Sequence, residues 1–304
     1  MNMITANYET PEITNVPRLA TSARLVELSM SVWTGRKQDK TATAQVASNN
    51  GANTAHINTT KALLGDCAEL DAVRKFAANT RQWVYGATTA WGDLGQRLLP
   101  MPCFPDFHKE ATALSTEFYR LVEEFLAAYD FAQTKAQASL GALFNPDEYP
   151  SSSSLRDKFR FSLVYAPMPE IGSVNQSFAQ GVQDEAERYL ADEYSRIYTE
   201  RLNDTMKEVW TRVYDALKHM SDRLDFSGEG SDKKRLYEST IDNVRDLCGM
   251  LPAFNVTNDS RLSTLHAELD QALMGVTTDA LREDAGYRAD TKKAMDEILS
   301  NMAW

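Results

Sequence analysis

The sequence predicts a mainly α-helical protein of the α+β class: a long antiparallel helical coil, a small antiparallel β-sheet at one end of it, and a C-terminal helical bundle. Residues 105–143 and 183–225 carry the prediction of the coil, because apolar residues recur in both at alternating spacings of four and three, as in helices that pack lengthwise. Residues 26–32 and 159–165 alternate apolar with polar side chains, which is typical of half-buried strands.

The first part of the chain predicts an arm, a strand and a short helix. Residues 1–17 are polar with two prolines and predict an extended N-terminal arm. After the first strand, the charged residues 35–40 predict a turn. Asp39 is suited to cap a helix that stops at Asn49, Asn50 and Gly51.

A second helix is predicted over residues 59–81, where Ala and Leu recur at helical spacing. Residues 82–102 interleave aromatic residues with glycines and predict a loop with a short strand. Pro105 then opens the first long helix, which we carry to about Leu143.

The two long helices are predicted to pack on each other. Two heptad-patterned helices in one chain favour an antiparallel pair, and a period near 3.5 residues predicts a left-handed supercoil. The expected contact residues are Phe107, Ala111, Leu114, Phe118, Leu121, Phe125 and Ala128 in the first helix, and Leu202, Met206, Val209, Val213, Ala216 and Met220 in the second.

Between the two long helices, residues 158–179 predict a β-hairpin whose second strand is Val174–Phe178. The helix of residues 183–225 contains no Gly or Pro. Its apolar pattern takes a five-residue step from Ile197 to Leu202, which predicts a bend or a change of packing partner near Arg201.

The C-terminal part predicts further helices after a Gly/Ser breaker. The predicted helices span residues 236–251, 260–274 and 278–302, and Pro252 is expected to end the first of them. The predicted division of the chain is an arm of residues 1–17, an elongated coil of residues 18–226 that carries the hairpin at about 158–179, and C-terminal helices of residues 232–304 packed on the coil.

Composition limits the environment and the partners. The net charge is −11 and the isoelectric point about 5.0, which argues against nucleic acid as the main partner. Three cysteines without a CxxC pair indicate neither a disulfide framework nor a zinc site. The first residues lack the pattern of a signal peptide, and no apolar run is long enough to span a membrane. We therefore expect a soluble intracellular protein without a membrane partner.

No catalytic signature stands out in the sequence. GxxxxGKS, GxGxxG, HExxH and a nucleophile elbow are absent, and the four histidines lie far apart. The sequence therefore predicts no catalytic residues, no metal ligands and no cofactor, and hence a protein that is not an enzyme.

Two groups of residues are candidate binding residues. Trp33 stands beside the basic residues Arg36, Lys37 and Lys40, which could contact phosphate or an acidic partner; the alternative is a solvated charged turn. A second group lies off the apolar pattern of the helix of residues 183–225. Aromatic residues in such positions mark either an interface or a second buried face against the C-terminal helices. This second group comprises Tyr189, Trp210 and Tyr214.

Three blocks of the sequence resemble a family of uncharacterised proteins of tailed bacteriophages and some bacteria. The blocks are Ser31–Lys37 (SVWTGRK), Thr88–Trp91 (TTAW) with Gly95–Pro100 (GQRLLP), and Lys158–Phe161 (KFRF) with Tyr165–Pro169 (YAPMP). The similarity runs over most of the chain and brings no assigned chemistry. What it implies is context, since relatives are often encoded near a MoxR-like AAA ATPase and a von Willebrand factor A-type protein.

The expected function is that of a phage-encoded, non-enzymatic interaction or assembly protein in the host cytoplasm. Its expected partners are proteins: further copies of itself in an oligomer, an AAA ATPase or a host factor. One alternative is a nucleic-acid-associated phage protein, such as a recombination factor or nuclease inhibitor, that uses the turn from Arg36 to Lys40. Another is a virion structural component whose N-terminal arm is ordered by a neighbouring subunit.

Overall fold

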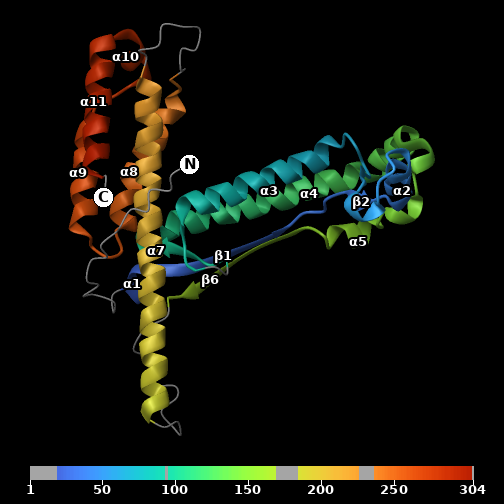
Figure 1. Cartoon of the computed structure of the whole chain (residues 1–304), viewed down its shortest axis with the longest axis horizontal. Helices are drawn as coiled ribbons and strands as arrows, with labels where there is room; N and C mark the ends of the chain where they lie inside the picture. Colours follow the sequence, from blue (N-terminus) through green and yellow to red (C-terminus); the bar gives the residue numbers. More distant parts are fainter. Residues whose placement is uncertain (1–18, 93–94, 169–183, 226–235, 303–304) are drawn as a thin grey trace. The chain divides into compact units, whose positions relative to one another are not determined.

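The computed structural model describes residues 19–92, 95–168, 184–225 and 236–302. These residues form mainly α-helices and a small antiparallel sheet, as predicted (Figure 1). Three predicted features lie outside the described residues: the arm of residues 1–17, the second hairpin strand at 174–178, and the Gly/Ser breaker at 227–231.

The chain divides into two compact units, each made of segments that are separated in the sequence. Unit 1 contains Met1–Glu27, Thr88–Pro105 and Tyr165–Trp304. Unit 2 contains Leu28–Ala87 and Asp106–Val164. Each unit has its own buried core.

Two helices, α3 and α4, build the core of unit 2. The rings of Trp83 and Phe107 stack at 4.7 Å, so the end of α3 lies beside the start of α4 and the two helices run antiparallel. The apolar stripe of α4 therefore faces α3, and not the helix of residues 183–225 as predicted. The helices span Ala68–Ala87 (α3) and Phe104–Leu140 (α4), and the buried residues they share in this core include Leu70, Val73, Ala77, Phe118, Val122 and Phe125.

The segment before α3 differs from the prediction in two places. The expected turn at 35–40 contains strand β2 (Arg36–Gln38), which pairs antiparallel with β3 (Thr60–Ala62). Because residues 60–62 are held in this ladder, α3 starts later than predicted, and it continues through Trp83 because that ring packs on α4. The Asp39 carboxylate caps α2 (Lys40–Asn49) by accepting a hydrogen bond from the Ala42 N–H at 2.9 Å, as predicted.

The larger sheet has four strands in the order β4-β5-β1-β6. In β1, Ala23 stands opposite Pro100 and Val26 opposite Arg97, and in β4 Thr89 stands opposite Leu98. The alternation of the sequence correctly predicts β1 and β6. The strands are β1 (Ala23–Ser31), β4 (Thr89–Ala90), β5 (Arg97–Pro100) and β6 (Arg160–Pro167); short helices precede β1 and β6 in the sequence, namely α1 (Leu19–Ser22) and α5 (Ser152–Arg156).

The long helix α7 (Asp184–Leu224) organises unit 1. It packs on α8 (Glu238–Phe254) and α11 (Ala285–Asn301), and α8 in turn packs on α9 (Ser260–Leu273). The stripe of α7 that was expected to face α4 is thus covered by the C-terminal helices. The buried residues of this core include Leu202, Met206, Val213, Met220, Ile241, Val244, Leu265, Met295 and Ile298.

Two predicted boundaries in the C-terminal part are wrong. Pro252 does not end α8, which continues to Phe254 because Leu251 and Phe254 are both buried in the core. The predicted helix of residues 278–302 is divided into α10 (Thr278–Glu283) and α11. The division falls at Asp284, whose extended backbone and side chain cap α11 by accepting from the N–H groups of Gly286 and Tyr287.

Candidate functional site

The apolar stripe of α7 continues beyond the core of unit 1. Tyr198 is buried, and its ring meets the Trp91 ring edge-on at 5.2 Å. One turn and two turns earlier, Tyr194 is 48% exposed and Leu190 is 37% exposed. Residues four apart lie on one helix face, so these three side chains form a single stripe that is buried at one end and exposed at the other.

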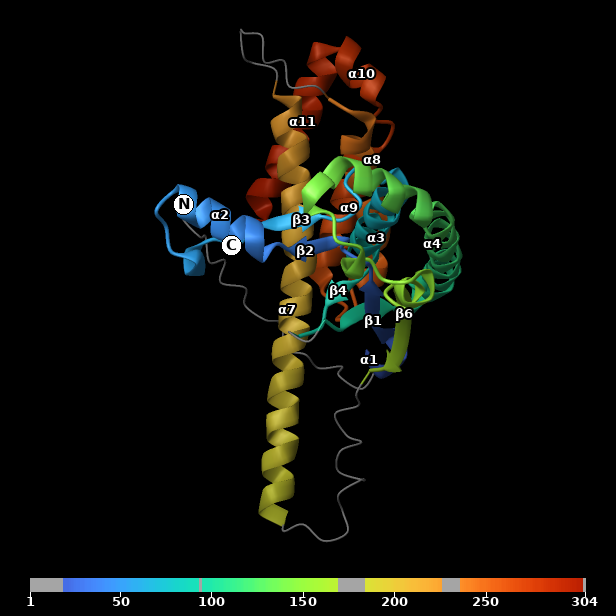
Figure 2. The same cartoon turned by 90° about the vertical axis from the view of Figure 1, so that its right-hand side faces the viewer.

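Figures 1 and 2 agree that the first part of α7 continues past the ends of α8, α9 and α11. Tyr189, a predicted binding residue, lies on this part and is 69% exposed. We call Leu190 and Tyr194, with Tyr189 beside them, the exposed stripe of α7. An exposed set of two tyrosines and a leucine on one helix is typical of a protein interface.

Charges of both signs flank the exposed stripe. The Arg196 guanidinium donates to Glu193 at 2.7 Å and to Glu200 at 3.2 Å. Its hydrogen bond to Glu193 holds the pKa of that carboxyl below its usual range. Because these side chains are exposed, the ion pairs contribute little to stability, and they remain accessible to a partner.

The other two predicted aromatic residues of α7 lie in the body of unit 1. Trp210 is buried and lines a cavity of about 220 Å³ with Leu265 of α9 and Ile298 of α11. Tyr214 is half-buried against the same core, and the Lys218 ammonium lies 5.8 Å from its ring centre. Of the two interpretations, an interface or a second buried face, Trp210 and Tyr214 fit the second buried face against the C-terminal helices.

In unit 2 the structure brings Trp33 and Arg36 together with two arginines that sequence reasoning missed. Arg74 and Arg81 are seven residues apart on α3, and therefore share one face of the helix. With Trp33 and Arg36 they line a hollow of about 660 Å³, here called the arginine hollow. The spacing of seven on a predicted helix is the signal that could have identified this pair.

Both arginines of α3 hold the chain that runs from β1 toward β2. Arg81 donates to the carbonyl of Met30 at 3.0 Å. Arg74 donates to the carbonyl of Thr34 and, at 2.7 Å, to the Asp71 carboxylate. Gly35 has a φ of +56°, and a Cβ there would lie 3.1 Å from Leu70 and 3.2 Å from the Arg74 guanidinium. A glycine is therefore needed where this chain passes α3.

The basic candidate residues of this region do not all line the arginine hollow. Lys37 and Lys40 are exposed and are not among the residues that line the hollow. Trp33 is half-buried, and its ring lies 6.1 Å from the rings of Phe125 and Tyr129. Of the four candidates near the start of the chain, the structure thus joins Trp33 and Arg36 and separates Lys37 and Lys40 from them.

Lys61 forms a compact ionic cluster beside β2 and β3. Its ammonium lies 2.7 Å from Glu148 and 3.5 Å from Asp39, and it donates to the carbonyl of Leu143 at 2.7 Å. The Ala42 N–H, and then Lys61, hold the pKa of Asp39 below its usual range, while Glu148 raises the pKa of Lys61. The cluster ties β3 to the cap of α2 and to the chain that follows α4.

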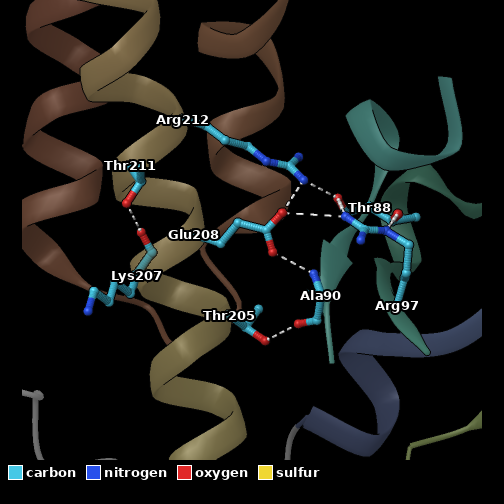
Figure 3. A network of polar contacts seen from close by, with 8 residues as sticks. All are labelled: Thr88, Ala90, Arg97, Thr205, Lys207, Glu208, Thr211 and Arg212. Carbon is cyan, nitrogen blue, oxygen red and sulfur yellow. Dashed lines mark hydrogen bonds and ion pairs between the residues drawn. The ribbon is translucent and has the colours of Figure 1, made fainter. Parts of the chain in front are cut away.

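A second polar network joins β4 to α7 in unit 1 (Figure 3). Glu208 accepts from the Ala90 N–H at 2.6 Å and from the guanidinium groups of Arg97 and Arg212. Arg212 also donates to the Thr88 carbonyl at 2.7 Å. Charges and main-chain groups are satisfied within the network, which gives it a structural role.

A cavity of about 300 Å³ between α8 and α9 contains residue types used in nucleophilic catalysis, namely Cys248, His266 and Asp270. Burial, and then Asp270, raise the pKa of the Cys248 thiol. Its Sγ lies 3.9 Å from the main-chain oxygen of His266 and donates to it. A reactive cysteine needs the opposite, a lowered pKa and a base for its proton, so this cavity does not present an activated nucleophile.

Two further features of the described residues bear on other classes of function. No group of three or more His, Cys, Asp or Glu side chains among them is placed to hold a metal ion. None of the helices in this part of the chain is both long and apolar enough to cross a membrane.

No protein-family model, no curated protein and no solved structure matches this chain.

Proposed function

We propose that this chain is a non-enzymatic interaction protein that docks the exposed stripe of α7 onto a protein partner. The observation that supports this function is the continuation of one apolar stripe from buried Tyr198 to exposed Tyr194 and Leu190. In this proposal α8, α9 and α11 act as a C-terminal bundle that anchors α7, and the first part of α7 is presented to the partner.

The proposed partner is a second copy of the chain, packed as a short antiparallel coiled coil. The residues from Asp184 to Ile197 amount to about 20 Å of helix, enough for nearly four turns of contact. An antiparallel copy would place the negative and positive residues that flank one stripe, such as Glu193 and Arg196, beside those of the other. The large aromatic side chains would supply the central contacts.

The resemblance to proteins of tailed phages sets the proposed context. In an infected cell the oligomer would work in the host cytoplasm, with a MoxR-like AAA ATPase or a host factor as its further partner. The proposed function therefore requires binding and assembly, without a catalytic step of its own.

The test compares two exposed tyrosines of unit 1, Tyr194 and Tyr237, which are 48% and 52% exposed. Analytical ultracentrifugation over a concentration series is expected to show that the unaltered chain self-associates. Tyr194→Ala should weaken association roughly thirtyfold, as expected for a central interface residue worth about 2 kcal/mol. Tyr237→Ala is the matched control and should leave association unchanged.

Two results would contradict the proposal. One is a chain that stays monomeric throughout the series and forms no complex with a purified MoxR-like AAA ATPase. The other is equal weakening by both substitutions, because this would place the interface away from the exposed stripe.

A further inference from the structure

We propose that the arginine hollow of unit 2 binds a nucleotide, that is, a phosphate group next to a planar ring, either free or within a single-stranded nucleic acid. This site goes beyond the proposed function, because it uses residues of unit 2 whereas the exposed stripe belongs to unit 1.

Positive charge is concentrated in the hollow. Arg36, Arg74 and Arg81 are all among its lining residues, and none of those lining residues is acidic. Asp71 pairs with Arg74 from outside the lining. Arg36 is exposed and forms no ion pair within the described part of the chain. Its guanidinium is therefore available to a phosphate, for which the planar fork of an arginine is well matched.

The arginines of α3 are held in place before any ligand arrives. Arg81 donates one N–H to the Met30 carbonyl, and Arg74 donates to the Thr34 carbonyl and to the Asp71 carboxylate. A guanidinium has five N–H donors, so each retains donors for a ligand after fixing its orientation. Binding then requires little ordering of these two side chains, which lowers its entropic cost.

The rest of the lining suits a ring beside the phosphate. The Trp33 ring packs beside the rings of Phe125 and Tyr129, and Trp33 also lines the hollow. A held aromatic side chain among cations is the arrangement with which proteins bind the bases of single strands. The hollow of about 660 Å³ lies within the range of small-ligand sites. Ser31 and Thr34, both exposed, add hydroxyl donors at its edge.

The overall charge of −11 repels a polyanion, so attraction in this protein has to be local. We therefore expect binding that is detectable at low ionic strength and that weakens as salt rises. For a single strand, each phosphate contact that is removed lowers the slope of log affinity against log salt by about 0.7.

The experiment uses two neighbouring residues of β2 as a matched pair. Arg36 lines the hollow, while Lys37 is equally charged and exposed but does not. Fluorescence anisotropy would follow a fluorescein-labelled oligothymidylate titrated with the full chain and with the variants Arg36→Ala and Lys37→Ala. Thermal unfolding of each variant checks that the fold is kept.

Arg36→Ala is expected to weaken binding of the oligothymidylate roughly tenfold and to reduce the salt slope. Lys37→Ala should change neither quantity. Competition with ATP identifies the source of the phosphate: displacement at a similar affinity indicates a free nucleotide, and a much weaker effect indicates a nucleic-acid strand.

Three outcomes would overturn the proposal. The first is the absence of binding of both the oligothymidylate and ATP at low salt. The second is an equal loss with both variants, which would show attraction to surface charge in general. The third is tighter binding of polyglutamate than of the oligothymidylate, which would assign the hollow to an acidic peptide.

Discussion

At the scale of single residues, Asp39 shows how one side chain can serve two elements. Its carboxylate caps α2 through the Ala42 N–H and lies 3.5 Å from the Lys61 ammonium. Both contacts favour the ionised form and lower the pKa of this carboxyl. A group with a lowered pKa in the folded state contributes stability above its unfolded value, and this contribution is lost as the pH falls through its folded value.

Asp39→Asn is expected to lower the free energy of unfolding at pH 6. The difference in this free energy between the variant and the unaltered chain should decrease as the pH falls below about 3.9. Asparagine can still cap α2, so the variant removes the charge and keeps the acceptor. Urea titrations at several pH values measure the difference. Asp147→Asn, which removes a carboxylate that forms no ion pair within the described residues, is the control. An effect of Asp39→Asn that is the same at every pH would contradict the assignment.

Some of these residues could be predicted from the sequence and others could not. Asp39 was identified as a cap because capping depends on neighbours in the sequence. Trp33 and Arg36 stood out by composition. The spacing of Arg74 and Arg81 indicates that they share a helix face, but their role depends on main-chain carbonyls about forty and fifty positions away, which only the fold brings near. The sequence placed no constraint on that proximity.

At the scale of elements, long helices were predictable and their partners were not. The absence of Gly and Pro and the apolar spacing are sufficient to predict α7. The same spacing in α4 predicts that α4 and α7 pack on each other. Any apolar stripe of similar width can pack on another, however, so the spacing does not specify the partner. Strands of two or three residues, such as β2 and β4, are too short to show alternation, so the sequence predicts a turn at β2 and only a short strand without bounds near β4.

The two parts of α7 should differ in hydrogen exchange. Amides from about Glu187 to Ile197 are expected to exchange faster than those from Leu202 to Leu224, because only the latter are covered by α8 and α11. Hydrogen exchange followed by mass spectrometry measures this on the isolated chain at low concentration. Raising the protein concentration should protect the first part selectively if α7 self-associates. Uniform protection along α7 at low concentration would rule out an exposed stripe.

At the scale of the whole molecule, two cores built from interleaved segments replace the single coil that the sequence suggested. Each core contains one buried cysteine, Cys248 in unit 1 and Cys67 in unit 2, and burial raises the pKa of both thiols. Such thiols are inert until the surrounding core opens. The chain therefore carries one natural reporter of opening for each unit.

Glu208→Gln is expected to accelerate alkylation of Cys248 with little effect on Cys67. The substitution removes the charge that pairs with Arg97 and Arg212 in unit 1, and breaking a partly buried ion pair typically costs about 2 kcal/mol or more. Glu193→Gln on the same helix breaks only an exposed pair and should change neither rate. Iodoacetamide labelling with peptide mapping reads both sites. Equal acceleration of both thiols would mean that the units open as one.

The chain crosses between the units at positions 27/28, 87/88, 105/106 and 164/165. During synthesis, every segment of unit 2 has been made once Val164 is added, while the first two segments of unit 1 still lack the helices that complete its core. A ribosome that pauses after this point would thus hold a chain that contains all of unit 2 but only the first two segments of unit 1. Neighbouring nascent chains on one transcript would then expose their incomplete unit 1 segments to each other before α11 is translated. The rate of translation would therefore affect correct folding.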